Sequence, residues 1–410
     1  MMILKEITNE EFTKFALEFP TKSIFQTTGY AFTMNKQHFD SVFLGLVDDS
    51  NSIRAASLIL IANIKGFKYA YAPRGFLIDY TNKELLKDFT FQIKKFLSRN
   101  DIIAIKINPI VIKNIYDKKG NLIATNNNDD IILENLKALG YEHKGFNNYF
   151  EAFKPRFEAI IDLKPDLNEL FMSCKKALRT KVRRAELNGI TIHRGDDRNI
   201  KYLYEQLKST YPRDLKYFQD SYEFYSRNNL IDFYYAKIET PTFLAQSQEL
   251  YQKQEQLVSE LSNTVILEAK NDSSKTLSMK LEADNLLASY KDQLIKATKL
   301  LKEHPEGIIT ACALVIKNGD EAVLLIDSRD KNYSSFNSKH ILLWKIICKY
   351  ASEGYKKFNL GAVSNIKLKP NKYQGLNDFK CNFNPKIYEY LGDFELVAIK
   401  SLYLMYQALK

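Results

Sequence analysis

Short runs of apolar residues alternate with polar turns and amphipathic stretches along the first 150 residues. The runs that favour strands are 41–47, 53–64, 67–71 and 102–108. Apolar residues recur at helical spacing over 83–98, and a polar turn at 126–130 precedes a second predicted helix, 131–139, which Gly140 ends. This mixture of strands and helices predicts an α/β or α+β fold.

A second series of the same kind begins near residue 157. Its predicted strands are 157–163, 190–194, 231–238, two runs within 308–328, and 358–360. Helices are predicted between these strands, and one of them, 338–353, contains Trp344. Because the two halves look alike, each is compatible with an acetyltransferase-like mixed sheet.

The segment 243–303 differs from both halves. It is rich in Gln, Leu, Lys, Glu and Ser, and leucines recur at intervals of seven, as in Leu287, Leu294 and Leu301. A polar turn signal at 271–274 lies in its middle, so the segment predicts an antiparallel helical hairpin. The alternative is a pair of helices folded back over the core. The segment has eight lysines, no arginine and nine acidic residues, so it is nearly neutral.

Length and composition bound the class of protein. A chain of 410 residues suits two or three domains, and a hydrophobic content of 45% is enough to fill real cores. The formal net charge of +10 favours a polyanionic partner such as nucleic acid, a pyrophosphate-containing substrate or an anionic membrane face. The alternative is an ordinary basic protein that binds no polyanion.

The cysteine spacing, the N-terminal segment and the hydropathy of the chain bear on its compartment. The four cysteines, Cys174, Cys312, Cys348 and Cys381, have no CxxC spacing and no neighbouring histidine cluster, so no zinc site is expected. The N-terminus lacks a signal-peptide pattern, and no apolar stretch reaches the roughly 18 residues that a membrane span needs. We therefore expect a cytoplasmic protein without a transmembrane segment.

Three short segments, taken in order, resemble one known family. The segments are Phe25-Gln26-Thr27 followed by Tyr30, Lys36, Tyr71-Ala72-Pro73-Arg74-Gly75 and Asp79-Tyr80; CKKALRTKVRRAELNG from Cys174 to Gly189; and GLNDFKCNF from Gly375 to Phe383. With a coiled-coil insertion before the last segment, they are similar to the FemA/FemB/FemX family of peptidoglycan-bridge aminoacyltransferases, and the similarity covers nearly the whole chain.

The resemblance implies two GNAT-like mixed-sheet domains with an inserted antiparallel coiled-coil arm. It also implies aminoacyl-tRNA as the donor, no other cofactor, and lipid II or UDP-MurNAc-pentapeptide as the acceptor. A lipid-linked acceptor implies peripheral association with the inner face of the cell membrane. The expected domains are 1–150 completed by 386–410, then 151–242 with 304–385, and the arm at 243–303.

The second segment is strongly basic. If 171–187 is one helix, Phe171, Cys174, Leu178 and Val182 share a face that packs on a sheet. Six cations occur within ten residues, which favours a nearby anion such as a phosphate of tRNA or of the precursor. The alternative is a solvated basic face, because like-charge pairs cost only tenths of a kcal/mol. The cations selected for this role are Lys175, Lys176, Arg179 and Arg183.

Lys380 and Phe379 are the candidate catalytic residues, and Lys380 carries the charge. It follows Phe379 and precedes Cys381, in a segment expected to be an ordered loop after the turn at Gly375. A lysine held between apolar neighbours is partly desolvated, so its charge acts strongly at short range. On local sequence alone a surface lysine is the alternative. In the family, the lysine of the matching Phe-Lys pair stabilises charge in the transition state.

Candidate acceptor-binding residues come from both halves. Lys36, which follows Tyr30, matches the family's phosphate-binding lysine, and an exposed helix lysine is the alternative. Arg74 is presented at the end of a predicted strand, where it either binds phosphate or pairs with Asp79. The remaining candidates, from the second half, are Arg213, Lys216 and Tyr225.

Two positions depart from the family pattern. The family often has Asp before the proline that follows its strand, but this chain has Asn108 before Pro109, so a carboxylate general base is absent there. The family also tends to have arginine shortly before an aromatic pair in the second half, where this chain has Asp220 before Phe224 and Tyr225. These changes are consistent with a different acceptor, such as a lipid-linked precursor.

The predicted chemistry is aminolysis of an ester, with Lys380 stabilising the oxyanion. The five histidines are scattered along the sequence, and no Ser-His-Asp or Cys-His pattern is convincing. One rival is a coenzyme-A N-acyltransferase, but segment 329–339 lacks the glycines of a pyrophosphate-binding loop. A second rival is an inactive adaptor that binds tRNA or a membrane.

Overall fold

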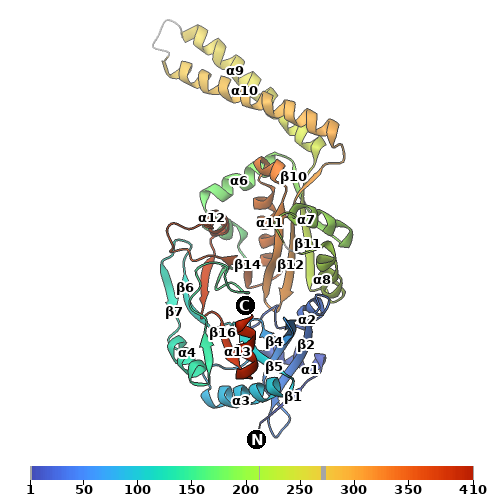
Figure 1. The fold of residues 1–410 in the computed structure, drawn as a ribbon. Helices are drawn as coiled ribbons and strands as arrows, with labels where there is room; N and C mark the ends of the chain where they lie inside the picture. Colours follow the sequence, from blue (N-terminus) through green and yellow to red (C-terminus); the bar gives the residue numbers. More distant parts are fainter. Residues whose placement is uncertain (1, 212, 269–273, 410) are drawn as a thin grey trace.

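A computed structural model describes residues 2–211, 213–268 and 274–409. In Figure 1 these residues form a body built on two sheets, from which a pair of long helices projects. The expected mixed α/β fold is confirmed, because each sheet contains parallel and antiparallel strands and is covered by helices.

The first sheet contains seven strands within the described residues. In spatial order they are β1 (Ile3–Glu6), β2 (Asp40–Val47), β3 (Ile53–Ile64), β4 (Phe67–Ala72), β5 (Ile102–Ile107), β16 (Phe394–Val397) and β8 (Tyr141–His143). Residues 55–60 of β3 are all buried, as expected for a strand with both faces covered. The covering helices are α1 (Asn9–Glu18), α2 (Thr28–Asn35), α3 (Lys83–Arg99), α4 (Asp129–Ala138) and α13 (Lys400–Ala408).

The second sheet contains nine strands within the same described ranges. In spatial order they are β10 (Ile190–Gly195), β11 (Ile231–Ile238), β12 (Ile308–Asn318), β13 (Glu321–Arg329), β14 (Lys357–Val363), β9 (Phe157–Asp162), β15 (Lys386–Tyr390), β6 (Ile112–Tyr116) and β7 (Leu122–Thr125). The helices associated with it are α5 (Leu167–Ser173), α6 (Lys176–Leu187), η1 (Asp197–Asn199), α7 (Ile200–Leu207), α8 (Leu215–Arg227), η2 (Lys331–Phe336), α11 (Ser338–Ser352) and α12 (Gln374–Cys381).

Strands β13 and β14 open away from each other. They pair in parallel only over residues 321–323 and 357–359, although β13 continues to Arg329 and β14 to Val363. Beyond the paired segment, backbone groups of both strands are available to side chains that enter between them. This opening places the candidate site described below.

Sheet membership crosses the expected domain bounds. Strands β6 and β7, from the first 150 residues, and β15, from the expected completion of the first domain, all belong to the second sheet. Only β16 of the C-terminal segment joins the first sheet. Since the two sheets exchange strands in this way, the division of the chain into domains stays a prediction.

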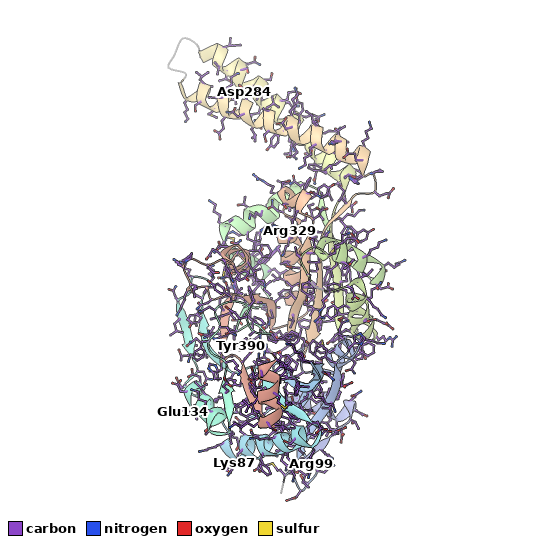
Figure 2. All side chains as sticks on the ribbon, in the orientation of Figure 1. Lys87, Arg99, Glu134, Asp284, Arg329 and Tyr390 are labelled. Carbon is purple, nitrogen blue, oxygen red and sulfur yellow. The ribbon has the colours of Figure 1, made fainter. Side chains whose placement is uncertain are left out.

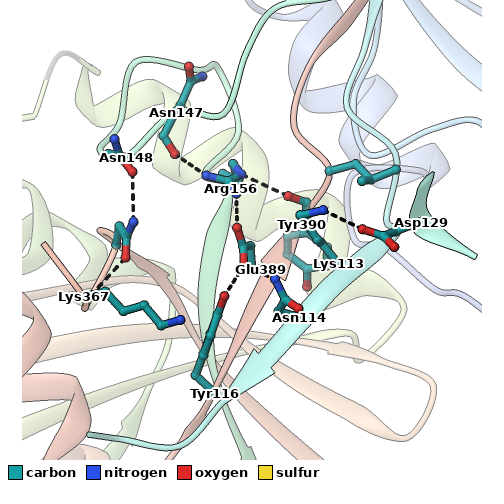
Figure 3. A network of polar contacts seen from close by, with 12 residues as sticks. Lys113, Asn114, Tyr116, Asp129, Asn147, Asn148, Arg156, Lys367, Glu389 and Tyr390 are labelled. Carbon is teal, nitrogen blue, oxygen red and sulfur yellow. Dashed lines mark hydrogen bonds and ion pairs between the residues drawn. The ribbon is translucent and has the colours of Figure 1, made fainter. Parts of the chain in front are cut away.

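A buried ion pair joins the strands that meet where the second sheet is completed. Arg156 pairs with Glu389 of β15 and donates from Nε to the Tyr390 carbonyl (3.2 Å), as Figure 3 shows. Glu389 Oε2 also accepts from Tyr116 (2.6 Å) and Asn114 (2.7 Å) of β6. All these groups are hydrogen-bonded, so the network favours one arrangement of β9, β15 and β6.

The projecting pair consists of α9 (Thr240–Glu268) and α10 (Ser274–Glu303). The two helices pack together through small and apolar residues such as Ala283 and Ala297, and Gln254 donates to the Ala283 carbonyl (3.0 Å). Figure 1 shows the pair extending away from the body, so the alternative of helices folded back over the core is wrong. The expected turn at 271–274 lies almost wholly outside the described residues, and the coiled-coil character stays a prediction.

Candidate active site

A cavity of about 420 Å³ lies near the middle of the body, where segments from the first half of the chain meet the second sheet. Figure 2 shows Tyr390, one of the lining residues, in this position between the sheets. The lining draws on β9, β13, β14 and β15 and on the segments that follow α1 and β4. Its polar residues include Arg74, Lys154, Glu158, Glu321, Asn359 and Tyr390.

Arg74 is buried in this cavity and forms an ion pair with Glu158 at 2.5 Å. Its guanidinium also lies over the Tyr390 ring, 4.6 Å from the centroid. Burial opposes the charge of Glu158, but Arg74 and the hydrogen bond from Asn359 hold the pKa of this carboxyl below its usual value. Of the two alternatives for Arg74, pairing with Asp79 is therefore wrong, and its role in substrate binding stays a prediction.

Asn108, which replaces the family's carboxylate, holds the turn after β4. Its Oδ1 accepts from the Arg74 backbone N–H (2.7 Å) and from the Tyr71 hydroxyl (3.1 Å), and the residue is buried. Arg74 has a φ of +55°, so this turn needs such support. Asn108 therefore has a structural task that rests on Oδ1 alone, since its Nδ2 is buried without a partner among the described residues.

Lys154 is a cavity residue that the sequence analysis missed. Its Nζ lies over the Phe25 ring, 3.2 Å from the centroid, and donates to the Tyr30 hydroxyl at 3.3 Å. Burial, together with the charge of Arg74, lowers the pKa of Lys154 well below its usual value. No local pattern marks this lysine, because Tyr30 and Phe25 are more than 120 residues away in the chain.

The candidate acceptor residues divide into a buried and an exposed group. Tyr30 and Tyr225 are buried where α2 meets α8, and the Tyr225 hydroxyl lies 3.2 Å from the Thr27 hydroxyl. Arg213 precedes α8, and its Nη1 donates to Gln37, which follows α2 (3.1 Å). Arg213 therefore lies at the same meeting of the two helices. The two lysines of the set, Lys36 and Lys216, are exposed, and neither lines the central cavity.

The structure places Lys380 on helix α12, not in the ordered loop that we expected. The glycine at 375 lies inside this helix with no crowding around it, so it does not form a turn. Lys380 is 9% exposed, and its Nζ donates to the Ala362 carbonyl at 2.7 Å. Burial lowers the pKa of Lys380 to about 8, against the opposing charge of Asp327.

Ala362 belongs to the part of β14 that has separated from β13, so Lys380 enters the opening between these strands. Gly361 and Ala362 also line the central cavity, which means that Lys380 reaches its wall from the far side. Helices α6, α11 and α12 lie on that far side (Figure 1). The candidate catalytic lysine thus lies between a central cavity and a separate, basic face.

Several polar groups surround the Phe379–Lys380 pair. Lys339 Nζ lies 4.6 Å from the Phe379 ring centroid and donates to Asp327 Oδ1 at 2.9 Å. His340 also packs on Phe379, and burial, with Lys181 and Lys339, lowers its pKa to about 4. His340 is therefore neutral at neutral pH. Nothing in the local sequence predicts its contact with Phe379.

The basic segment forms two helices instead of one. The chain leaves helical geometry at Cys174, whose ψ is 155°, so Lys175 precedes α6 and Phe171 lies on α5. Arg179 donates to the Met172 and Cys174 carbonyls (2.7 and 2.8 Å), which occupies its guanidinium at the end of α5. The cations that this segment leaves exposed are Lys176, Arg183 and Arg184.

A groove of about 660 Å³ runs between α6 and the base of the arm. Arg183, Arg184 and Lys296 line it, together with Phe336 of η2. Segment 329–339 is the place where a coenzyme-A enzyme would need a glycine-rich loop. It contains the short 3₁₀ helix η2 and the start of α11. Among the residues that the structure describes, no cluster of His, Cys, Asp or Glu is arranged to hold a metal ion.

Two mixed sheets covered by helices, one of them opened beside a buried lysine, define a GNAT-like class of fold. The fold matches the crystal structure of FemX with a TM-score of 0.76, at 24% identity, covering 98% of this chain and 99% of that one. FemX has GNAT-like domains, so the expected fold class is confirmed.

The sequence comparisons identify the family. Residues 7–410 match the model of the FemAB family, and the chain belongs to that family. It is 27% identical to lipid II:glycine glycyltransferases of Staphylococcus aureus strains USA300 and MRSA252, over 98% of this chain and 95% of each relative. In the parts of the chain that are described, no helix is both long and apolar enough to cross a bilayer.

Proposed function

We propose that this protein transfers an amino acid from aminoacyl-tRNA to a stem-peptide amine of a lipid-linked peptidoglycan precursor. The observation that supports this most directly is the position of Lys380, between the central cavity and a basic face. Two large substrates that react with each other must reach the reacting atoms from different directions. The cavity and the basic face provide two such routes to Lys380. The names of the similar proteins from S. aureus supply the acceptor class.

The basic face suits the donor. Exposed cations of α6 line the groove at the base of the arm, and Lys181, Lys339 and Arg329 gather around His340 near the start of α11. Cations spaced along a groove bind a phosphate backbone with little dependence on sequence. The start of a helix adds a favourable field for an anion. We infer that the terminal nucleotides of tRNA follow this surface toward Lys380.

The central cavity suits the acceptor. It offers cations, aromatic rings and carboxylates at one place, with Lys154 on Phe25 and Tyr30 and with Arg74 on Tyr390. Stem peptides contain amide, carboxylate and amine groups, and the precursor adds a pyrophosphate, so such a mixed lining matches them. A lipid-linked acceptor would place the protein in the cytoplasm at the inner face of the membrane.

The chemistry follows from this arrangement. The acceptor amine enters from the cavity and attacks the ester carbonyl carbon; a C–N bond forms and the C–O bond to the ribose breaks. Lys380 stabilises the negative charge on the carbonyl oxygen in between. The proton lost by the amine ends on the released ribose oxygen. No acyl-enzyme is needed, because the aminoacyl ester is already activated.

A transfer assay with labelled donors tests the proposal. Purified protein is mixed with tRNAs charged with different radiolabelled amino acids, and with either lipid II or UDP-MurNAc-pentapeptide. We expect label to appear in the lipid-linked acceptor, and the amino acid transferred to be identified by the donor that is consumed. Transfer from an acyl-coenzyme A donor, with none from any aminoacyl-tRNA, would contradict the proposal, and so would an absence of transfer from both.

A further inference from the structure

Asp327 has a buried carboxylate oxygen with no partner. The residue lies on β13 beyond the point where this strand leaves β14, and its side chain is 17% exposed. Oδ1 accepts from Lys339, but Oδ2 is buried and makes no hydrogen bond within the described parts of the chain. An unsatisfied buried carboxylate oxygen is costly, so its presence in a folded protein calls for an explanation.

Asp327 lies beside the Phe379–Lys380 pair, because Lys339, which donates to Asp327 Oδ1, also lies over the Phe379 ring. The charge of Asp327 opposes the effect of burial on the Lys380 pKa, yet none of the ion pairs within 4.0 Å among the described residues joins the two. The other charges that act on Lys380 are those of Lys339 and Glu158, and His340, which packs on Phe379, is neutral. A lysine and a carboxylate oxygen without a partner, both beyond the paired part of β13 and β14, suit a group that is anionic at one atom and cationic at a nearby one.

An aminoacyl ester undergoing transfer is such a group. Its carbonyl oxygen becomes negative during attack, while the α-amino group, on the adjacent carbon, is an ammonium ion. We propose that Asp327 Oδ2 binds the α-ammonium group of the aminoacyl donor while Lys380 receives the carbonyl oxygen. This inference rests on the proposed function. Lys339 binds the other carboxylate oxygen, Oδ1, and leaves Oδ2 for the donor.

Such a contact would make Asp327 the residue that selects free aminoacyl groups. A donor without the α-ammonium, such as an N-acylated or α-hydroxyacyl ester, would leave a buried charge without its partner. The loss of one partner of a buried charged pair typically costs about 10² in affinity or rate. A site built to bond a substrate N–H rejects the analogue that lacks it, because the polar group of the site is then left without a partner.

The test compares two donors on one enzyme preparation. The same tRNA is charged with an amino acid or with its α-hydroxy analogue, and kcat/KM for transfer to the lipid-linked acceptor is measured with wild-type protein and with Asp327→Asn. Wild type is expected to prefer the amino donor by about 10². The variant is expected to lose most of that preference, because transfer from the amino donor slows and transfer from the hydroxy donor does not. Since each ratio comes from one preparation, partial unfolding cancels.

Two further variants separate the alternatives. Asp378→Asn removes an exposed carboxylate from the same helix as Lys380 and should leave the preference unchanged. Lys339→Gln should retain most of the preference; if it abolished the preference as Asp327→Asn does, Asp327 would serve only to hold Lys339. An equal slowing of both donors by Asp327→Asn would show that it acts on Lys380 or as a base, and would overturn the inference. If wild type used neither donor, the proposed function itself would fail.

Discussion

Replacing Lys380 by Met should remove most activity without destabilising the protein. Burial lowers the pKa of this lysine from 10.5 to about 8, so keeping it charged at neutral pH costs the folded state about 3 kcal/mol. Loss of its hydrogen bond to the Ala362 carbonyl costs about 1 kcal/mol in return. Lys380→Met is therefore expected to be as stable as wild type, or about 2 kcal/mol more stable, at pH 7.

The sign of the pH dependence follows from the lowered pKa. Below pH 8 the wild-type lysine is charged in both states, and the full cost is present. Between pH 8 and 10.5 the folded protein binds fewer protons than the unfolded chain, so wild-type stability rises relative to the Met variant as pH increases. Urea unfolding of both proteins at pH 7 and pH 9.5 measures this difference, with exposed Lys400→Met as the matched control.

Activity should change in the opposite direction. A preorganised donor at an oxyanion is worth about 10² to 10³ in rate, so single-turnover transfer by Lys380→Met should fall by at least about 10². Lys400→Met should transfer at the wild-type rate. A Lys380→Met protein that retained more than about a tenth of wild-type activity would refute the assigned role. A large loss of stability at pH 7 would refute the assigned cost of burial.

Three further predictions concern other parts of the structure. Arg183→Ala with Arg184→Ala should weaken tRNA binding and reduce the slope of log K against log salt by about 1 to 2, measured by filter binding; an unchanged slope would assign these residues to a solvated face. Arg74→Met should destabilise the protein by about 3–5 kcal/mol in urea unfolding, because Glu158 is left buried and unpaired, and a loss under 1 kcal/mol would contradict this. Replacing 250–299 by a short Gly/Ser turn should leave the tRNA Kd within about threefold, since the arm is nearly neutral, whereas a tenfold loss in a folded variant would assign it to tRNA binding.

Local patterns predicted most of the regular elements. The runs of apolar residues at β3, β11 and β12 and the helical spacing of α3 and α11 match the observed elements within a few residues, because each depends on contacts along one segment. The break between α5 and α6 was missed, since the apolar spacing continues across it. Gly375 and Asn377 favour turns, so the local sequence predicts a loop where the structure has helix α12. Packing of the helix on β14 outweighs that local preference.

The sequence predicts some residues of the candidate site, but it does not predict which side chains they contact. Lys380 and Phe379 were found through a family resemblance, and the structure shows what surrounds them. Lys154, Asp327 and His340 have no local signal, since their partners lie on other strands and helices. Arg74 and Glu158 are 84 residues apart in the chain. They pair because the segment after β4 of the first sheet lies against β9 of the second sheet.

The exchange of strands between the sheets has a consequence for synthesis on the ribosome. The first sheet needs β16 between β5 and β8, and the second needs β15 between β9 and β6, so both have a gap until residues 386–397 emerge. Bacterial-type elongation at about 5–20 residues per second leaves earlier strands waiting for their last neighbour for tens of seconds. During that time the edges of β5, β6, β8 and β9 are open to wrong partners. Premature termination anywhere before residue 386 would therefore leave two incomplete sheets, not one folded domain and one missing domain.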